Sequence, residues 1–270
     1  MVSILTPSFQ QGKFLEENIK SVLDQQYEPF EHVVVDGAST DNTIDVLKMY
    51  PHVHWVSEND NGQADALNKG LKLAVGDIIG WINADDFYEA NTFHEVAKEF
   101  EDSSVAWVIG NITTMYEQTG KLVHERSPVV TYQRLIRDPD IVRQQGAFFR
   151  RTFLESVGGW NGDLYLAMDY DLWIRMAKVS VPRMIDRSWG VFRIQPNQKT
   201  SGRNAVRQLQ EIVASLKREH APHSTVLKIC LRKCLYILKY YFKILLIRIH
   251  VIHVRFAHLP LLDRITNENP

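Results

Sequence analysis

Two adjacent carboxylates, Asp85 and Asp86, follow the apolar run at residues 78–82. Paired carboxylates behind a buried strand suit a hard divalent cation such as Mg²⁺ or Mn²⁺, which keeps coordination positions open for phosphate oxygens. The alternative for such a pair is a solvated helix start, where the helix dipole stabilises aspartate. Acidic loops after the neighbouring strands favour the metal site.

Two further positions present carboxylates that could contact a substrate. Asp36 ends the β-branched run at residues 32–35, where it could hydrogen-bond a nucleotide base or ribose, or form an Asx turn into the next helix. Asp169 and Asp171 stand at the start of a predicted helix. A carboxylate there could act as a general base toward an acceptor hydroxyl. Helix capping is the alternative, and we expect it to describe Asp171.

Strands and helices that must position these side chains alternate along the first hundred residues. The pattern predicts strands at 2–5, 32–35, 54–57 and 78–82, and helices at 13–26, 40–50 and 63–75. Ser39 or Thr40 is the predicted N-cap of the second helix, and Gly76 the predicted C-cap of the third. Such alternation predicts an α/β fold with a mostly parallel sheet.

Small, polar and acidic residues gather in the loops that follow the predicted strands. These loops are residues 6–9, 36–39, 58–62 and 83–86, whereas the loops at the other ends of the strands, 27–30 and 51–52, lack this character. Ligands of parallel α/β sheets bind beyond the carboxyl ends of the strands. The asymmetry therefore marks one edge of the sheet as the site.

The alternation weakens after about residue 103. The pattern there predicts strands at 105–109 and 110–115 with a turn at Gly120, a buried strand at 145–149, and a helical turn at 153–157. A helix at 167–177, an extended stretch at 182–194 and a long helix at 205–219 follow. We divide the chain into a catalytic domain, 1–205, and a helical extension, 206–270.

Composition excludes several classes of protein. The 270 residues are 45% hydrophobic and 23% charged, which is typical of a globular protein rather than a disordered chain, a collagen or a coiled-coil rod. The net charge of −1 argues against a globally basic nucleic-acid binder. Two cysteines, Cys230 and Cys234, and the absence of a leader pattern lead us to expect a cytoplasmic protein.

Taken in order, the motifs resemble those of the inverting family-2 glycosyltransferases, which have the GT-A fold and build bacterial surface polysaccharides. The matching stretches are residues 6–9, 21–26, 34–43, 68–70, 76–77, 83–86, 145–148, 158–160 and 169–175. Each stretch is weak alone, but the ordered series spans residues 2–200. The resemblance implies a GT-A domain followed here by a C-terminal helical extension.

The resemblance also implies a role for each site residue. Nucleotide and donor sugar would be bound by Thr6, Pro7, Phe9, Asp36, Asp60, Asn68 and Asp86. Asp85 would be the principal ligand of Mn²⁺ or Mg²⁺, and Asp169 would be the catalytic base. The implied reaction moves one sugar from a nucleotide-diphosphate sugar, UDP-linked, to a hydroxyl of a lipid-linked or growing glycan acceptor. A single displacement inverts the anomeric centre.

Three positions depart from the family pattern: Asn83 replaces the first Asp of a D-x-D motif, Met168 replaces a Glu before the base, and Gln195 replaces a His near the metal. They keep open the alternative of an inactive relative that acts as a membrane-associated partner in glycan assembly. A nucleotidyltransferase is the second alternative, although residues 6–13 are poor in the Gly and Arg that its phosphate loop needs.

The C-terminal region is basic and apolar. Between Glu219 and Asp263 there are seven Lys or Arg residues and no acidic one. Helical spacing gathers Lys228, Arg232, Lys239, Lys243 and His250 within about 60° of one another. We expect residues 223–258 to lie on an anionic membrane surface at the inner face of the plasma membrane. Packing on the catalytic domain or on a second copy in a homo-oligomer is the alternative. No nucleic-acid recognition module accompanies the stripe, so we expect no nucleic-acid partner.

Overall fold

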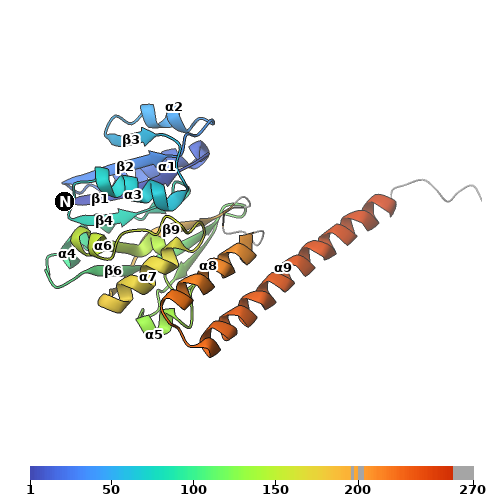
Figure 1. Cartoon of the computed structure of the whole chain (residues 1–270). Coiled ribbons are helices and arrows are strands. Elements are labelled where there is room, and N and C mark those ends of the chain that lie inside the picture. The colour runs from blue at the N-terminus through green and yellow to red at the C-terminus, as the bar shows by residue number, and fades with distance from the viewer. Residues whose placement is uncertain (196–197, 200–203, 258–270) are drawn as a thin grey trace, which may run out of the picture.

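The computed structural model describes residues 1–195, 198–199 and 204–257. They form a layered α/β body from which one long helix extends (Figure 1). The strands are β1 (Val2–Ser8), β2 (Phe30–Asp36), β3 (Val53–Ser57), β4 (Ile78–Trp81), β5 (Phe87–Tyr88), β6 (Trp107–Tyr116), β7 (Lys121–Glu125), β8 (Ala147–Arg150) and β9 (Arg183–Ile194). The helices are α1 (Gly12–Leu23), α2 (Thr43–Lys48), α3 (Gln63–Leu73), α4 (Thr92–Glu99), α5 (Tyr132–Leu135), α6 (Arg151–Ser156), α7 (Met168–Val179), α8 (Ala205–Arg218) and α9 (His223–Ala257), with a 3₁₀ turn η1 (Gln144–Gly146).

One sheet contains the nine strands of the described residues, in the order β3-β2-β1-β4-β8-β6-β9-β5, with β7 paired to β6. Strands β3, β2, β1 and β4 are parallel, and their carboxyl ends meet at one edge, where Ser8 pairs with Asp36 and Asp36 with Ser57. Strand β8 is antiparallel to β4 and β6, whereas β6 and β9 run parallel. The predicted α/β class with a mostly parallel sheet is therefore confirmed.

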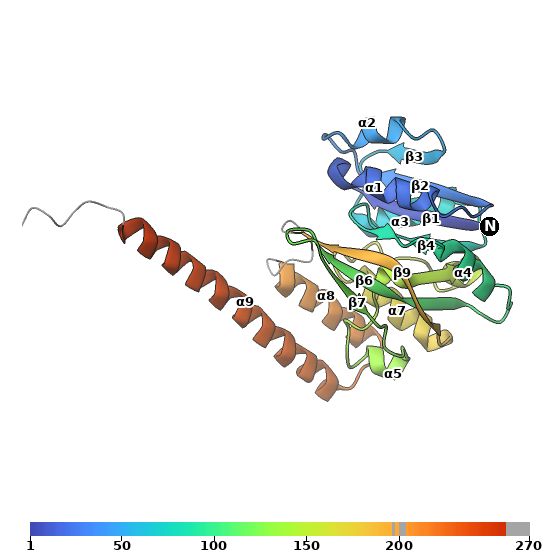
Figure 2. The same cartoon turned by 180° about the vertical axis from the view of Figure 1, so that it is seen from behind.

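Helices cover both faces of this sheet (Figures 1 and 2). In β2, Val33 and Val35 belong to the core cluster shared with α3, α7 and α8, while Val34 packs with α1 and α2. Successive side chains of a strand point to opposite faces. The continuous apolar run of β2 thus fills both layers, as expected for a strand buried on each side.

Helix α2 begins at Thr43 with Asn42 as its N-cap residue, so the predicted cap at Ser39 or Thr40 is wrong. Both hydroxyls are engaged elsewhere. Ser39 Oγ donates to Asp36 Oδ1 at 2.5 Å, and Thr40 Oγ1 accepts a hydrogen bond from a glutamine side chain that follows β1. The residues between β2 and α2 therefore form a turn that belongs to the edge of the sheet.

Two further boundaries differ from the sequence-based expectation. The predicted strands 105–109 and 110–115 are one strand, β6, and Gly110 lies within it because the ring of Trp189 in β9 occupies the space that its side chain would need. Helix α3 ends at the cap residue Ala74 rather than at Gly76. The turn predicted at Gly120 is present between β6 and β7, with a φ of 66°.

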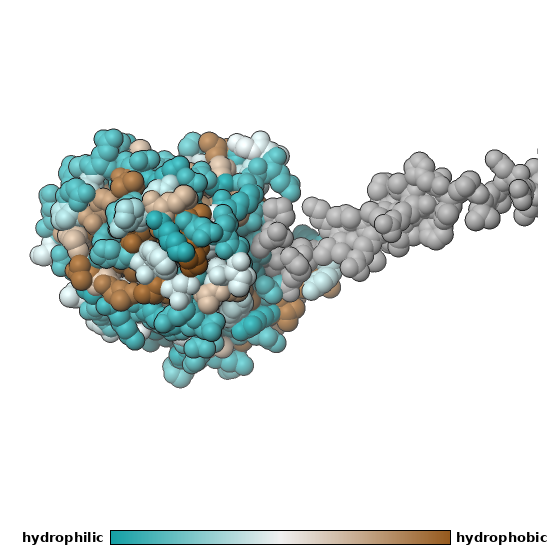
Figure 3. Space-filling view, turned by 90° about the horizontal axis from the view of Figure 1, so that it is seen from above, coloured by the Kyte–Doolittle hydropathy of each residue, from teal (hydrophilic) through white to brown (hydrophobic). Residues whose placement is uncertain are grey.

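The last two helices begin as part of the body. Ile212 and Leu216 of α8 and Ile229 of α9 are buried in the largest core cluster. Beyond these turns α9 extends away from the sheet (Figures 1 and 2). Its exposed large apolar residues include Leu227, Leu231, Leu235, Tyr236, Leu238, Tyr241 and Phe242. On the face seen in Figure 3, hydrophilic residues predominate over the body, with hydrophobic ones scattered among them.

The residues of the predicted basic stripe differ in their surroundings. Lys228 and Lys239 are exposed, whereas Arg232 pairs with Asp138 at 3.0 Å, so packing on the body accounts for this part of the helix. The side chains of Lys243 and His250 lie outside the described residues, as do residues 258–270. Among the described helices, none has the length and apolar character needed to cross a membrane. The helical extension is confirmed, and the boundary at 205/206 stays a prediction.

Candidate active site

A cleft of about 1490 Å³ follows the edge of the sheet at which β1, β2, β3 and β4 end. Pro7, Phe9, Asp60 and Asp85 line it from the loops after these strands, and Asp169 lines it from α7. Residues of α8 and the first turns of α9 complete the wall beyond α7. The cleft thus lies at the edge where the polar loops were expected to gather.

Asp86 is a buried carboxylate whose oxygens are occupied by the protein itself. Its Oδ1 accepts the backbone N–H of Arg193 at 2.9 Å, and its Oδ2 accepts Gln145 Nε2 at 2.7 Å and Asn83 Nδ2 at 3.2 Å. Burial raises the pKa of Asp86 well above its usual range, and the charge of Asp85 raises it further. Asp86 therefore joins the loop after β4 to β9 and η1, which is a structural task.

Asp85 is half-buried and has one side-chain partner among the described residues. Gln195 Nε2 donates to its Oδ2 at 2.9 Å. Burial raises the pKa of Asp85, although this hydrogen bond and the positive charge of Arg193 oppose the increase. Of the two adjacent carboxylates, Asp85 is thus the less engaged and the more accessible from the cleft.

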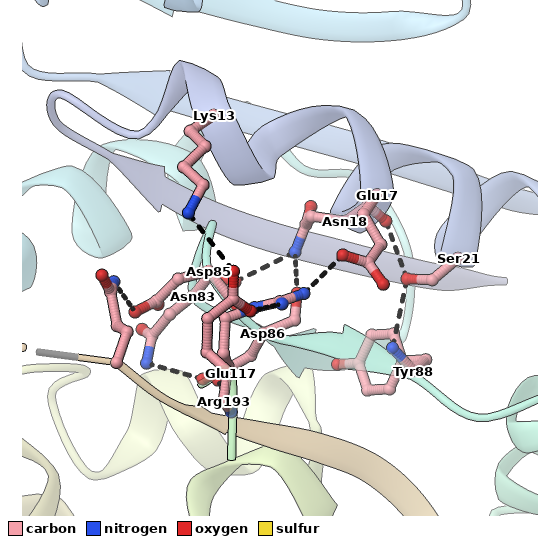
Figure 4. Close-up of polar contacts among 11 residues, drawn as sticks. Lys13, Glu17, Asn18, Ser21, Asn83, Asp85, Asp86, Tyr88, Glu117 and Arg193 are labelled. Atoms are coloured by element: carbon pink, nitrogen blue, oxygen red, sulfur yellow. Dashed lines mark hydrogen bonds and ion pairs between the residues drawn. The ribbon is translucent and has the colours of Figure 1, made fainter. Parts of the chain in front are cut away.

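Arg193 braces the acidic loop from below, as Figure 4 shows. Its side chain is 6% exposed, and its Nε donates to the backbone oxygen of Asp85 at 2.8 Å. Its guanidinium forms ion pairs with Glu17 of α1 and Glu117 after β6, and lies 5.0 Å above the ring of Phe14. The Arg193 guanidinium thus connects α1, the segment after β6 and the acidic loop after β4.

Thr6 and Asp36 lie at the edge of the sheet but beneath the cleft surface. Asp36 is fully buried, and its carboxylate accepts the N–H and Oγ of Ser39 and Ser57 Oγ at 2.5–2.9 Å. Thr6 Oγ1 lies 2.9 Å from His32 Nε2. Neither Thr6 nor Asp36 lines the cleft among the described residues. Asp36 adopts the Asx-type turn that was its alternative assignment, and it orders the loop beside the cleft.

Phe9, Gly37 and Asp60 converge at the far end of the cleft from three successive strand ends. A Cβ atom on Gly37 would lie 2.9 Å from Asp60 Oδ2 and 3.3 Å from Phe9 Cδ2, so this glycine allows the three loops to approach. The side chain of Phe9 is 61% exposed. Ser8 Oγ, also at the cleft wall, is buried without a hydrogen-bond partner among the described residues. An exposed aromatic face beside polar groups suits a planar nucleobase.

Asn68 lies away from the cleft and secures another loop of the family pattern. Its Nδ2 donates to the backbone oxygen of Trp160 at 2.7 Å, and its Oδ1 accepts the N–H of Trp160 at 3.0 Å. A side chain on Gly159 would meet Asn68 Oδ1 at 2.7 Å. In this structure Asn68 fixes the Gly158-Gly159-Trp160 turn against α3, and it contributes no atom to the cleft lining.

Asp169 occupies the first turn of α7 and faces the cleft. It is half-buried, and its Oδ1 accepts the N–H of Tyr170 at 2.7 Å. Burial raises the pKa of Asp169 to about 6, the negative charge of Asp140 raises it as well, and Tyr170 N–H and Lys199 oppose the shift. A carboxylate with a pKa just below neutral can accept a proton at pH 7 while remaining ionised beforehand.

Asp171, two residues further on, was expected to cap the same helix, and this expectation is wrong. Its buried carboxylate forms ion pairs with Arg175 at 2.8 Å and with Arg218 of α8. The capping task falls to Glu211 of α8, whose Oε2 accepts two backbone N–H groups just before α7 at 2.7 and 2.9 Å. Sequence analysis could not show this because the cap comes from a distant helix.

Lys199 brings a cation into the cleft that the sequence analysis did not single out. Its Nζ lies 3.3 Å from Gln63 Oε1 and 3.9 Å from the centre of the Tyr165 ring. Burial lowers the pKa of Lys199 to about 8, while the charge of Asp169 opposes this shift. Arg193 and Lys199 were missed because no matching motif includes them, and Ser8 was not singled out although it lies within the matching stretch 6–9 at the end of β1.

The donor atoms at the acidic loop suit a metal shared with a substrate. No group of three His, Cys, Asp or Glu side chains within the described parts of the chain is arranged to enclose a metal ion. Mg²⁺ is commonly held by one or two carboxylates together with substrate phosphates, so Asp85 is an adequate protein ligand. Of the neighbouring amides, Asn83 Oδ1 already accepts hydrogen bonds from Gln63 and Trp81, and Gln195 presents its N–H group to Asp85.

Taken together, a mixed sheet with carboxylates at the carboxyl ends of its parallel strands defines the class of GT-A glycosyltransferases. Solved structures share this fold. Staphylococcus aureus TarS 1–349 in complex with UDP matches at a TM-score of 0.62 and 19% identity, over 80% of this chain and 65% of that one. A mannosyltransferase from Pyrobaculum calidifontis, in complex with GDP-Man and Mn²⁺, matches at 0.58 and 22% identity, over 87% and 69%.

The chain belongs to glycosyl transferase family 2, whose family model matches residues 3–158. A PGL/p-HBAD biosynthesis glycosyltransferase of Mycobacterium bovis is 30% identical over 201 residues, 69% of this chain and 73% of the relative. A putative teichuronic acid biosynthesis glycosyltransferase of Bacillus subtilis is 33% identical over 113 residues, 40% and 44%. The Escherichia coli chondroitin synthase is 25% identical over 192 residues, 69% and 28%. The family and GT-A fold expected from the sequence are confirmed.

Proposed function

We propose that this glycosyltransferase moves one sugar from a nucleotide-diphosphate sugar, UDP-linked, to a hydroxyl of a glycan acceptor in surface polysaccharide synthesis, with inversion. The observation that carries the proposal is that one cleft contains Asp85 and Asp169, with the exposed ring of Phe9 at its far end. Relatives named for teichuronic acid and chondroitin synthesis, and fold neighbours holding UDP or GDP-Man, support the substrate class.

In this proposal the nucleotide lies at the β1–β3 end of the cleft. Phe9 offers its ring face to the base, Asp60 and Pro7 line the same cleft, and Asp36 holds the loop after β2 in shape. Thr6 and Asn68 act behind the surface, through the hydrogen bonds that fix β1 and the Trp160 turn. The pocket is thus preorganised before the donor binds.

The diphosphate then extends toward the acidic loop. Asp85 would hold Mn²⁺ or Mg²⁺ there, with Asp86 keeping the loop in register. When bound, the divalent cation neutralises the negative charge that develops on the departing nucleoside diphosphate. Asp169 takes the proton of the acceptor hydroxyl, which attacks the anomeric carbon on the face opposite the leaving group.

A donor panel tests the substrate class. The melting temperature of the full chain is measured with UDP-, GDP- and dTDP-sugars, each with and without Mn²⁺. A ligand at one hundred times its Kd stabilises the folded state by about 2.7 kcal/mol, which is about 5 °C or more for a chain of this size. We expect a UDP-sugar with Mn²⁺ to give this shift and to release UDP, with the transferred sugar in the inverted anomer.

Four outcomes would each overturn the proposal or one part of it. Stabilisation by none of the nucleotide-sugars would favour the inactive relative. Release of pyrophosphate from a nucleoside triphosphate would favour the nucleotidyltransferase. A transferred sugar with the donor's own anomeric configuration would remove the single-displacement step, and unchanged activity in a chelator would remove the metal.

The acceptor is lipid-linked in this proposal, and α9 brings the enzyme to the anionic inner surface of the plasma membrane. Lys228 and Lys239 are exposed on the helix, as are Leu238 and Phe242. Basic helices with exposed leucine and phenylalanine bind anionic interfaces through charge and apolar burial together.

Vesicle flotation tests this placement. We expect the full chain to float with vesicles that contain anionic phosphatidylglycerol and to stay behind with neutral ones. The Leu238→Glu/Phe242→Glu variant should lose flotation, whereas Val75→Glu, at an equally exposed apolar residue of the body, should not. Equal flotation of both variants and wild type would contradict the proposal.

A further inference from the structure

Lys199 is a half-buried cation in the cleft that has no carboxylate partner among the described residues. Its Nζ donates a hydrogen bond to Gln63 Oε1 at 3.3 Å and lies 3.9 Å from the centre of the Tyr165 ring. A second cation at this ring, Arg207, lies 4.4 Å from the ring centre and pairs with Glu211 at 3.1 Å. Lys199 is among the described residues that line the cleft, and Arg207 is not. Of these two cations, Lys199 is therefore the one whose charge faces the cleft without an anion.

The carboxylates around Lys199 are engaged by other groups. Burial lowers the pKa of Lys199 to about 8, and the charges of Asp169, Glu211 and Asp60 oppose this shift only in part. Asp169 and Asp60 each accept a backbone N–H, and Glu211 accepts two. Burial of a cation costs free energy unless an anion binds it. The cleft thus contains a positive charge, still mostly protonated at pH 7, that an anionic ligand can use.

Gln63 connects Lys199 to the acidic loop after β4. Its Oε1 accepts the hydrogen bond of Lys199, and its Nε2 donates to Asn83 Oδ1 at 2.6 Å. Asn83 lies two residues before Asp85 in this loop. From the segment after β9, Gln195 Nε2 donates to Asp85 Oδ2 at 2.9 Å, four residues before Lys199. Lys199 and Asp85 therefore border the same part of the cleft.

We propose that Lys199 is a second binding group for the diphosphate of the donor, so that part of the diphosphate binding does not need a divalent cation. A diphosphate at the acidic loop would lie beside Asp85, in the part of the cleft that Lys199 also borders. Lysine binds phosphate groups as a point charge. This role rests on the nucleotide-sugar binding proposed above, and it adds a direct contact to the one made through the metal.

The residues around Asp85 give a reason for a second positive charge. Asp86 is engaged by three hydrogen bonds, and Asn83 and Gln195 are neutral amides. Of the two carboxylates in this loop, Asp85 is thus the one that is accessible to a metal. A fixed cation attracts a diphosphate whether or not a metal is bound, and it has no such effect on an uncharged nucleoside.

Calorimetry of the full chain with uridine and with UDP tests this role. The Kd of each ligand is measured in Mn²⁺ and in a chelator, for wild type and Lys199→Met; if the donor panel selects another base, the matching nucleoside and diphosphate are used. In the chelator, we expect wild type to bind UDP more tightly than uridine by about tenfold or more, the size of one charge-assisted hydrogen bond. Lys199→Met should lose this preference and keep the wild-type affinity for uridine.

Three further measurements separate the charge of Lys199 from its packing. Lys199→Arg keeps a cation that binds phosphate and should retain most of the preference for UDP. Arg207→Met removes the other cation from the Tyr165 ring and should leave the preference unchanged. Lys199→Met should not lower the melting temperature of the free chain, because methionine keeps the contact with the ring and removes a desolvated charge.

Two kinds of result would overturn the role of Lys199. The first is an equal preference for UDP over uridine in Lys199→Met and wild type, or no such preference in wild type in the chelator. The second is a loss of uridine and UDP affinity in equal proportion, which would show that Lys199 only shapes the cleft. A wild-type chain that binds neither UDP, GDP nor dTDP, with or without Mn²⁺, would instead defeat the proposed function.

Discussion

Asp85 and Asp86 are adjacent in the chain but have different surroundings. Asp86 accepts three hydrogen bonds from β9, η1 and its own loop, whereas Asp85 accepts one side-chain hydrogen bond, from Gln195. A buried carboxylate that already holds several donors keeps few lone pairs for a ligand. Asp85 is therefore the carboxylate that we propose as the metal ligand, whereas Asp86 holds its loop in place.

Asp85→Asn should therefore remove metal-dependent donor binding while leaving the fold intact. We expect the rise in melting temperature produced by a UDP-sugar with Mn²⁺ to fall to the value seen with the nucleotide alone, since a neutral amide is a poorer ligand of a hard cation. Thermal denaturation with and without Mn²⁺ measures this. Asp45→Asn, at an exposed aspartate of α2, is the control. Undiminished stabilisation of Asp85→Asn by Mn²⁺ would contradict the assignment.

At the residue scale the sequence predicted which carboxylates gather at the cleft but not the surroundings of each side chain. Asp85, Asp86 and Asp169 were predicted from their positions after a strand and at a helix start, and all three line the cleft. That Asp36 is fully occupied could not be predicted, because one partner, Ser57, lies 21 residues further on. A local pattern describes only residues that are close in the chain. Partners from distant segments determine how many lone pairs of a carboxylate remain available for a ligand.

The elements that form the site are joined by charged side chains at their ends. Arg193, near the end of β9, contacts α1 and the segment after β6, and Lys13 of α1 reaches Glu117 at 3.2 Å (Figure 4). Glu211 of α8 caps the start of α7, the helix that carries Asp169. Each contact fixes one wall of the cleft relative to another.

Arg193→Met should destabilise the folded chain by about 2–3 kcal/mol. The substitution removes charge-assisted hydrogen bonds of a largely buried guanidinium and leaves Glu17 and Glu117 without their shared cation. Urea denaturation gives the free energy of unfolding. Arg187→Met breaks an exposed 3.9 Å pair with Glu95 and should have little effect. An equal loss of unfolding free energy in the two variants would contradict a stabilising role of the buried Arg193 contacts.

At the element scale, periodicity predicted most strands and helices but not their junctions. The strands from β1 to β4 and their helices follow from alternating apolar runs, which each element forms with its own residues. The caps of α2 and α7 were missed, because tertiary contacts occupy Ser39 and supply Glu211 from another helix. The ends of a helix depend on contacts with other elements, which the periodicity of its own sequence does not show.

The molecule as a whole is built on a sheet that is covered on both faces and has the cleft along one edge. His32 illustrates the cost at the centre of that sheet: it is fully buried, and burial lowers its pKa to about 3. An unfolded histidine has a pKa of about 6.5, so the unfolded chain binds a proton that the folded chain rejects. His32 therefore contributes stability above pH 6.5 that is lost as the pH falls toward 3.

His32→Gln should make the free energy of unfolding less dependent on pH between 6.5 and 4. A single histidine whose pKa is lowered by folding changes that free energy by up to about 1.4 kcal/mol per pH unit. Carboxyl groups titrate in the same way in wild type and variant, so the difference between the two slopes gives the contribution of His32. Urea denaturation at several pH values measures both slopes. His94→Gln, at an exposed histidine of α4, should retain the wild-type slope. Parallel curves for His32→Gln and wild type would contradict this account.

At the scale of the whole chain, the ordered motifs predicted the GT-A body, while the course of α9 was not predictable. The basic stripe indicated a membrane-facing helix, but Arg232 and Lys233 pair with Asp138 and Asp140, more than ninety residues earlier in the chain. Composition predicts that a helix is basic and amphipathic. The charges of the helix that face the protein are those that meet acidic residues of the body, and a helical projection of α9 alone does not include these residues.

The comparison of Asp169→Asn with wild type tests the central claim most directly. UDP release from the active donor and UDP affinity by calorimetry are measured for both, from pH 5 to pH 8. Wild-type turnover should fall as the pH drops below about 6, because Asp169 must be ionised to accept a proton. Asp169→Asn should lose about 10²–10⁴-fold in turnover while binding UDP as tightly as wild type. Retained turnover, or UDP affinity lost together with it, would contradict the assignment of Asp169 as the base.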